Sequence, residues 1–242
     1  MMLSFIDKLT NNTLLVKILV AVIMVLVIVA LWLVRSLKTK RKMTIRDISL
    51  ISIFAALSFV LYFLKISLPI FPSFLEMNLS MLPIIMIGFI LGPVEGVTVV
   101  LLRTFLKIPF TSTACVGEIA DMLIGLAVVL TTSIIYDYHK TKKGAIIALI
   151  FGSVAWILAG VITNWLINIP FYVALYFNND VNILIGLLSM IPNVNESNYM
   201  IKYLLFAVVP FNLILSCIVS LITFLTYKKI SFLCKKNIEK QE

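Results

Sequence analysis

The chain has 242 residues, of which 62% are hydrophobic and only 13% are charged, and its formal net charge at pH 7 is +9. Soluble domains carry about 25% charged residues, so this composition excludes a soluble globular protein. The apolar residues come in helix-length runs instead of the alternating ten-residue segments of an outer-membrane barrel. We therefore expect an all-α integral membrane protein.

Seven stretches are apolar enough to enter a bilayer. The first, at residues 14–34, ends in a basic block instead of a small-residue cleavage site, which favours a retained N-terminal anchor over a signal peptide. Six more follow, at residues 48–64, 81–91, 94–106, 119–136, 145–165 and 203–227. We predict three parts: a transmembrane anchor with a basic cytoplasmic loop (1–43), a six-helix membrane domain (44–230) and a basic cytoplasmic tail (231–242).

The stretches at 81–91 and 94–106 are shorter than the roughly 20 residues that a spanning helix needs. Gly92 and Pro93 separate them, and proline both removes a backbone donor and restricts the residue before it. This pattern favours a tight helical hairpin, and one kinked helix is the alternative. The two interpretations place everything downstream on opposite sides of the membrane.

The basic residues favour the hairpin. Most of the 20 Lys and Arg residues lie in three segments, at residues 35–46, 140–143 and 228–240. Cytoplasmic loops carry an excess of Lys and Arg, and the three segments share one side only if the hairpin crosses the membrane twice. We therefore expect a multi-pass protein of the plasma membrane with a cytoplasmic C-terminus and an extracellular N-terminus. The net positive charge is then explained by membrane topology and by contact with lipid headgroups, and not by binding to a nucleic acid.

The signatures of several enzyme classes are missing from the sequence. It contains no Gly-rich phosphate loop ending in Lys-Ser/Thr, no metalloprotease helix motif and no Gly-x-Ser-x-Gly elbow. The three cysteines have no paired spacing, and the one histidine, His139, lies in a basic loop. We expect neither an enzyme nor a metal site nor a disulfide framework.

Polar side chains inside apolar stretches point to function, because burying an amide or carboxyl without a partner costs roughly 2–7 kcal/mol. One group begins at Thr113, in a hydroxyl-rich stretch that leads into a helix with Glu118 and Asp121 on one face. Two carboxylates there suit proton coupling or cation binding. Neutralisation of one of them by Arg103 or Lys107 is the alternative.

A second group consists of amides. Asn164 and Asn168 lie four residues apart on one helix face beside Trp165, and Asn212 follows a proline in the last stretch. An amide offers donors and acceptors together, which suits a heterocycle with carbonyl and N–H groups. Hydrogen bonds between helices would satisfy the same amides.

The loop at residues 65–80 is rich in proline and aromatic residues. It places Phe71, Phe74 and Leu75 outside any predicted helix. Apolar side chains in such a loop either pack on the helix bundle or line a pocket.

Together these residues resemble the riboflavin-specific substrate-binding (S) component of energy-coupling factor (ECF) vitamin transporters. The resemblance covers about residues 44–227 and rests on motifs in the same order and spacing: residues 71–78, Leu-Gly-Pro at 91–93, Gly-Glu-Ile-Ala-Asp at 117–121, Asn164, and Pro-Phe-Asn at 210–212. It implies a six-helix core that holds a small vitamin near the outer face, with the first core loop as a gate. It also implies three partner subunits, a transmembrane T component and two cytoplasmic ECF ATPases, because this chain has no ATPase motif.

The resemblance implies riboflavin as the transported ligand and no cofactor. Asn164 and Asn212 would hydrogen-bond the heterocycle, and Glu118 would order the pocket. The full set of expected ligand-binding residues is Phe71, Phe74, Leu75, Asn78, Thr113, Glu118, Asn164, Trp165, Asn168 and Asn212. Ser52 and Ala56, four residues apart on the first core helix, are the expected contact with the T component.

The sequence departs from this pattern at Leu215, where riboflavin-specific members carry a lysine, and Lys202 is a candidate substitute. An S component for a different vitamin is therefore an alternative. An ion-coupled secondary transporter that uses Glu118 and Asp121 as its coupling pair is another. A structural membrane protein, whose polar positions are filled by helix contacts alone, is the third.

Overall fold

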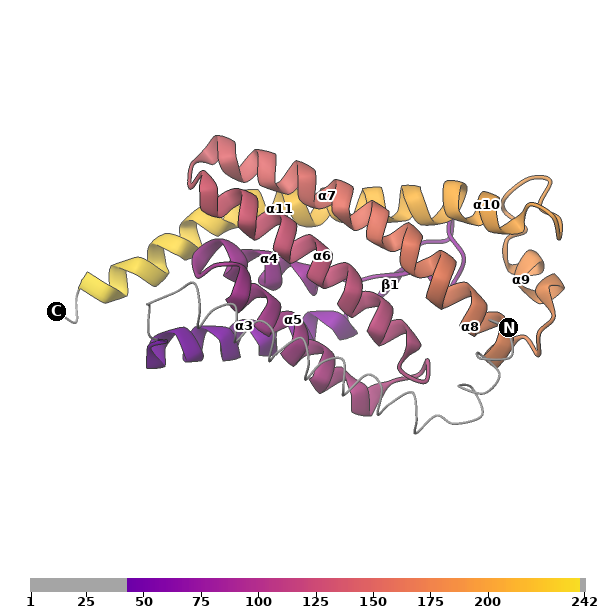
Figure 1. The fold of residues 1–242 in the computed structure, drawn as a ribbon, viewed down its shortest axis with the longest axis horizontal. Helices are drawn as coiled ribbons and strands as arrows, with labels where there is room; N and C mark the ends of the chain where they lie inside the picture. The colour runs from indigo at the N-terminus through magenta and orange to yellow at the C-terminus, as the bar shows by residue number, and fades with distance from the viewer. Residues whose placement is uncertain (1–42, 240–242) are drawn as a thin grey trace.

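The computed structural model describes residues 43–239, which form a bundle of helices (Figure 1). In chain order the elements are α3 (Ile45–Phe63), β1 (Ile66–Ser67), β2 (Glu76–Met77), α4 (Met81–Ile90), α5 (Pro93–Lys107), η1 (Ile108–Phe110), α6 (Val116–Tyr138), α7 (Lys142–Thr163), η2 (Asn164–Asn168), α8 (Ile169–Tyr176), α9 (Val181–Leu187), α10 (Tyr199–Tyr203), η3 (Leu204–Val208) and α11 (Val209–Glu239). The predicted helical fold class is confirmed. The predicted N-terminal anchor lies outside the described residues.

Within residues 43–239, four helical segments are long and apolar enough to cross a membrane: Ile45–Phe63, Val116–Tyr138, Lys142–Tyr176 and Tyr199–Lys229. Helices α4 and α5, with 10 and 15 residues, are shorter than the roughly 20 residues of a full crossing. The first core helix, α3, begins at a capping box, in which Thr44 and Asp47 each accept the other's backbone N–H.

Helices α4 and α5 form a hairpin. Gly92 between them has a φ of +130°, a conformation that side chains with a Cβ rarely adopt. A Cβ placed on Gly96 would lie 3.2 Å from the Cα of Gly88, whereas residues eight apart in one straight helix are about 12 Å apart. The chain therefore reverses, so the hairpin is confirmed and the single kinked helix is wrong.

Two long helices each continue through a short turn of different geometry. Helix α7 passes through η2 into α8, and α10 passes through η3 into α11. Both η2 and η3 are π-helical turns, and Pro170 and Pro210 are the second residues of the helices that follow. A proline clashes with the carbonyl four residues earlier, and the wider π turn relieves this clash without ending the helix. The predicted end at residue 165 was too early for this reason.

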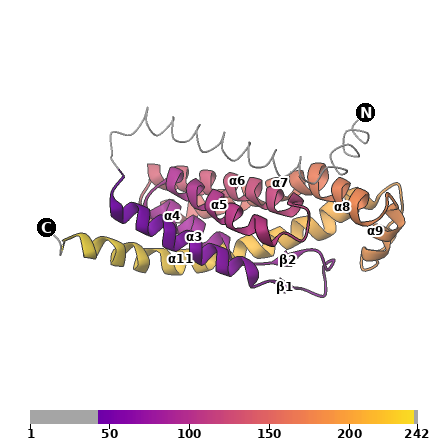
Figure 2. The same ribbon diagram turned by 90° about the horizontal axis from the view of Figure 1, so that it is seen from below.

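The bundle has two distinct ends. The loop end holds the β1–β2 ribbon, η1 and α9, and the C-terminal end holds the turn between α6 and α7 and the far end of α11 (Figures 1 and 2). In the ribbon the two strands are antiparallel, with Ile66 opposite Met77. Helix α11 runs without a break to Glu239, past the boundary at residue 230 that the sequence suggested.

We predict that Gly96→Val lowers the free energy of unfolding by about 1–3 kcal/mol, the usual cost of overpacking a close-packed core. The added Cβ would lie 2.5 Å from Cγ2 of Val129 on α6 and 3.2 Å from the backbone of Gly88. Thermal unfolding of the full chain in detergent measures the effect. Gly186→Val is the matched control, because a Cβ at Gly186 meets nothing within 4 Å, and an equal loss in both variants would contradict the close contact.

Candidate functional site

A cavity of about 460 Å³ lies within the loop end of the bundle. Its walls come from the 65–81 segment, the start of α6, the continuous helix α7–η2–α8, and α11. Eight of the ten residues predicted to bind a ligand line it: Phe74, Leu75, Asn78, Thr113, Glu118, Asn164, Asn168 and Asn212. The tertiary structure therefore brings segments more than 100 residues apart in the sequence to one hollow.

The other two predicted residues lie outside the lining. Phe71 is buried and packs edge-on against Phe211, with ring centroids 5.5 Å apart, so it supports a lining residue from behind. Trp165 is 54% exposed on the outer face of η2, because one residue along a helix turns the side chain by about 100° from Asn164. A different tryptophan, Trp156, is buried and lines the cavity.

One face of the continuous helix α7–η2–α8 forms much of the cavity wall. Trp156, Asn164, Asn168, Tyr172 and Tyr176 all line the cavity, and their numbers differ by multiples of four. Sequence reasoning found the two asparagines but not the two tyrosines, because it ended this helix before Pro170. The spacing of four itself was the signal that the same face continued.

The amides of Asn164 and Asn212 meet at Gly160. Asn164 donates to the carbonyl of Gly160 at 2.8 Å, and Tyr203 donates its hydroxyl to Oδ1 of Asn164 at 2.7 Å. Asn212 donates to the carbonyl of Val208 at 2.8 Å, and a Cβ on Gly160 would lie 2.8 Å from its Nδ2. Glycine thus permits the approach of α11 to α7, and helix contacts use only part of each amide's hydrogen-bonding capacity.

Asn168 has an acceptor that the protein does not use. Its Oδ1 is buried and has no hydrogen-bond partner among residues 43–239. Buried polar atoms nearly always have a partner, and Asn168 lines the cavity. Because the atom is buried, a ligand that donates an N–H or O–H would supply the missing bond only if the side chain of Asn168 turned toward the cavity.

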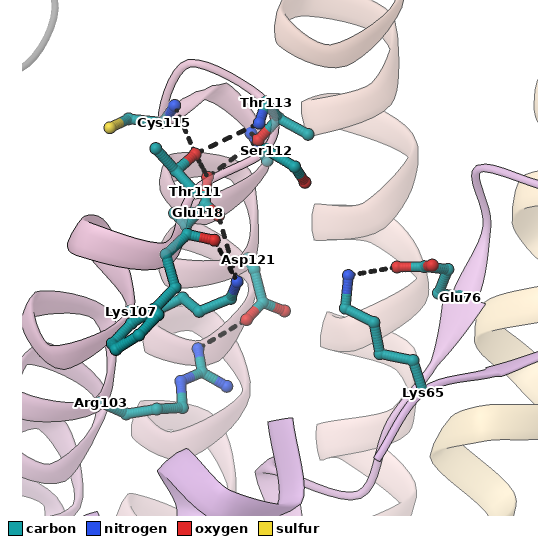
Figure 3. Close-up of polar contacts among 12 residues, drawn as sticks. Lys65, Glu76, Arg103, Lys107, Thr111, Ser112, Thr113, Cys115, Glu118 and Asp121 are labelled. Carbon is teal, nitrogen blue, oxygen red and sulfur yellow. Dashed lines mark hydrogen bonds and ion pairs between the residues drawn. The ribbon is translucent and has the colours of Figure 1, made fainter. Parts of the chain in front are cut away.

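Glu118 organises the loop that leads into α6. Its Oε2 accepts the hydroxyls of Thr111 and Thr113 at 2.8 and 2.9 Å (Figure 3). Each of these hydroxyls accepts backbone N–H groups in turn, including those of Cys115 and Gly117. One carboxylate therefore holds a loop in which Cys115 adopts a φ of +70°.

The two acidic residues near the start of α6 each face a buried cation from α5. Arg103 lies 2.7 Å from Oδ2 of Asp121, and Lys107 lies 3.9 Å from Oε1 of Glu118 (Figure 3). Unpaired charges are very costly away from water, so these pairs satisfy the carboxylates within the bundle. The sequence offered neutralisation of one carboxylate as an alternative, and the structure has an ion pair at each of the two. No group of three residues suited to a metal ion occurs in the described part of the chain.

The β1–β2 ribbon and its loop cover the remaining side of the cavity. Lys65 and Glu76 form an ion pair across the ribbon, opposite the α5 and α6 pairs (Figure 3). Phe74 contacts Tyr172 and Tyr203, with ring centroids 6.0 and 5.8 Å apart. The contact with Tyr172 is edge-on and the contact with Tyr203 is tilted, and aromatic pairs contribute about 0.5–1.5 kcal/mol each.

Two residues discussed as ligand contacts have different surroundings. Leu215 is buried and lines the cavity, one turn after Asn212. Lys202 donates to the carbonyls of Pro192 and Asn193 in the 177–199 loop and does not line the cavity. It therefore does not take the place of a lysine at position 215.

Ser52 and Ala56 lie exposed on the outer face of α3. The hydroxyl of Ser52 donates to the carbonyl of Ile48 in its own helix at 3.0 Å. The use of this face by a partner subunit stays a prediction.

The chain is similar to a group of known transport proteins. A family model described as the substrate-specific component of ECF transporters matches residues 46–227. "Riboflavin transporter RibU" of Staphylococcus aureus is 26% identical over 186 residues, covering 77% of this chain and 90% of that relative. "Riboflavin transporter FmnP" of Bacillus subtilis is 25% identical over 133 residues, covering 54% of this chain and 70% of that relative.

A solved structure of the S component of a bacterial ECF transporter shares the fold. It superposes with a TM-score of 0.58 at 26% identity, covering 78% of this chain and 97% of that chain.

We predict that Arg103→Met alone lowers the free energy of unfolding by about 3 kcal/mol, because it leaves Asp121 without its buried cation. The double change Arg103→Met with Asp121→Leu should recover most of this loss, since it removes both charges. Chemical unfolding of the single and double variants in detergent measures the coupling. Losses that simply add would show that the two side chains do not interact.

Proposed function

Because the chain belongs to the family of ECF transporter substrate-specific components, we propose that it binds riboflavin in the loop-end cavity and delivers it to an ATP-driven importer. One observation carries this function: a cavity of about 460 Å³ lined by asparagines from separate helices, one with a buried acceptor that lacks a partner. Its volume falls in the range of about 300–1,000 Å³ that is usual for small-molecule sites. The names of the relatives from S. aureus and B. subtilis support riboflavin as the ligand.

The chemistry of the lining suits a flavin. The edge of the ring system carries carbonyl oxygens and one N–H. The carbonyls match the free donors of Asn164 and Asn212, and the N–H matches the acceptor of Asn168 once that buried side chain turns toward the cavity. The flat faces of the ring match aromatic side chains, supplied by Phe74, Tyr172 and Trp156. In this proposal Glu118 orders the pocket without reacting.

The charge distribution supports an orientation in the membrane. Among the described residues, Arg46, Lys140, Lys142, Lys143, Lys228 and Lys229 lie near the C-terminal end. By the excess of Lys and Arg in cytoplasmic segments, this end faces the cytoplasm and the cavity faces the outside. The exposed face of α3 with Ser52 and Ala56 then meets the T component, and two ATPases supply the energy.

The ion pairs weigh against an ion-coupled transporter. A coupling carboxylate has to bind and release its ion, whereas Glu118 and Asp121 are already matched by Lys107 and Arg103. The cavity also weighs against a purely structural protein, because helix contacts leave Asn168 Oδ1 without a partner.

We predict that the protein purified from riboflavin-containing cells carries the absorbance spectrum of a bound flavin. After removal of the ligand, it should quench the fluorescence of added riboflavin with a stoichiometry of one and without any ion gradient. A colourless protein that also leaves riboflavin fluorescence unchanged would reject riboflavin as the ligand.

We predict that Asn164→Ala and Asn212→Ala each weaken riboflavin binding about tenfold, because a hydrogen bond lost at a buried site costs about 1–1.5 kcal/mol. Fluorescence titration measures the dissociation constant. Leu166→Ala is the matched control, since Leu166 lies in the same π turn as Asn164 but is 49% exposed and outside the lining. If both asparagine variants bind as tightly as the unchanged chain, the amides serve only helix packing.

A further inference from the structure

Arg103 is the largest fully buried side chain in the described residues, with 1% exposure, yet it does not line the cavity. Its guanidinium has four neighbours, one of which is Sδ of Met81, 3.9 Å from a terminal nitrogen. One terminal nitrogen lies 2.7 Å from the carboxylate of Asp121, the other donates to Oγ of Ser80 at 2.7 Å, and the group lies 5.3 Å from the centre of the Tyr62 ring. The ion pair with Asp121 thus holds the arginine so that its second nitrogen reaches the segment between β2 and α4.

The hydrogen bond to Ser80 has only one possible direction. An arginine donates and never accepts, so Oγ of Ser80 accepts from Arg103 and its own hydrogen is free to donate. It donates to Oδ1 of Asn78 at 2.6 Å. The backbone N–H of Ser80 donates to the same atom at 3.1 Å. Two donors therefore identify this atom as the amide oxygen and fix the orientation of the amide.

The segment that carries this chain of bonds is itself held in place. Ser80 is fully buried, and its carbonyl accepts the hydroxyl of Ser58 on α3 at 2.7 Å. Asn78 lines the cavity, and no acceptor among residues 43–239 takes a hydrogen bond from its Nδ2. With the oxygen engaged by Ser80, the amide N–H group is the polar part that Asn78 offers to a ligand.

We propose that Arg103 and Ser80 are positioning residues that set the ligand specificity of the site through Asn78. Arg103 directs the hydroxyl of Ser80, Ser80 directs the amide of Asn78, and the amide then requires a hydrogen-bond acceptor on the ligand. On a flavin this acceptor is a ring carbonyl or an unprotonated ring nitrogen. We call this chain of hydrogen bonds, from Arg103 through Ser80 to Asn78, the relay. The identity of its ligand rests on the proposed function, whereas its geometry does not.

The relay can be tested by changing the acceptor on the ligand. The full chain and its Asn78→Asp and Ser80→Ala variants are titrated with riboflavin, 2-thioriboflavin and 4-thioriboflavin, because sulfur accepts hydrogen bonds more weakly than oxygen. We expect the unchanged chain to bind one thio analogue about tenfold more weakly than riboflavin, the size of one lost hydrogen bond. In both variants the ratio of the dissociation constants for this thio analogue and for riboflavin should fall toward one. A purely structural role would change the affinity for all three ligands by the same factor and keep the ratio, which would overturn the relay.

The Asn78→Asp variant distinguishes two roles of residue 78: donating a hydrogen bond to the ligand, and packing against its neighbours in the protein. Its carboxylate still accepts both Ser80 donors and gains attraction to Arg103, so a structural role predicts unchanged or better stability and binding. The relay predicts a stable variant that binds riboflavin at least tenfold more weakly, because an acceptor replaces the donor that faces the ligand. Tight riboflavin binding by this variant would contradict the relay.

A measurement without ligand keeps the relay distinct from the proposed function. The side-chain amide resonance of Asn78 is recorded for the full chain in lipid nanodiscs labelled with ¹⁵N-asparagine, and is assigned by its loss in Asn78→Asp. We expect it to move in Ser80→Ala and in the double variant Arg103→Met with Asp121→Leu, since both remove the directing donor. An unmoved resonance in either one overturns the relay even if riboflavin binds. Conversely, a moved resonance supports it even if riboflavin proves to be the wrong vitamin.

Discussion

A polar group at membrane depth has to find its partner inside the protein or in a ligand, since lipid offers none. In this bundle the charged members meet that requirement among themselves. Arg103 pairs with Asp121, and Lys107 faces Glu118. The amides meet it only in part, because Asn168 has an acceptor without a partner in the part of the chain that the structure describes. This difference follows from the free-energy cost of burial. A buried charge without a partner costs far more than a buried amide without one, so only the amide can remain unpaired until a ligand binds.

The two π turns bring these amides to one place. η2 and η3 pack against each other where α7 and α11 meet, and each turn is followed by a proline. π turns inside helices occur frequently at functional sites. Here they let long helices continue past Pro170 and Pro210, so that Asn164 and Tyr172 belong to one wall. Gly160 then allows Asn212 to approach from the opposite helix.

Much of the fold and part of the site followed from local patterns. Hydropathy identified the described spanning helices, and Gly92-Pro93 identified the hairpin, because both signals depend on residues close in the sequence. The motif order also indicated the ECF family, which the match over residues 46–227 confirms. Trp165 was placed at the site by its neighbour in sequence, whereas the structure puts Trp156 there, two helical turns earlier on the same face as Asn164.

The sequence alone was sufficient for the membrane class, the hairpin and the polar residues that needed an explanation, since composition, helix period and the price of burial are local properties. It left open whether Glu118 and Asp121 were free or paired. Only the tertiary structure decided this, by placing α5 against α6 with Arg103 and Lys107 opposite them. No sequence pattern could likewise predict the orientation of the Asn78 amide. It depends on a chain of contacts with Ser80 and Arg103, and packing between residues far apart in the sequence sets that geometry.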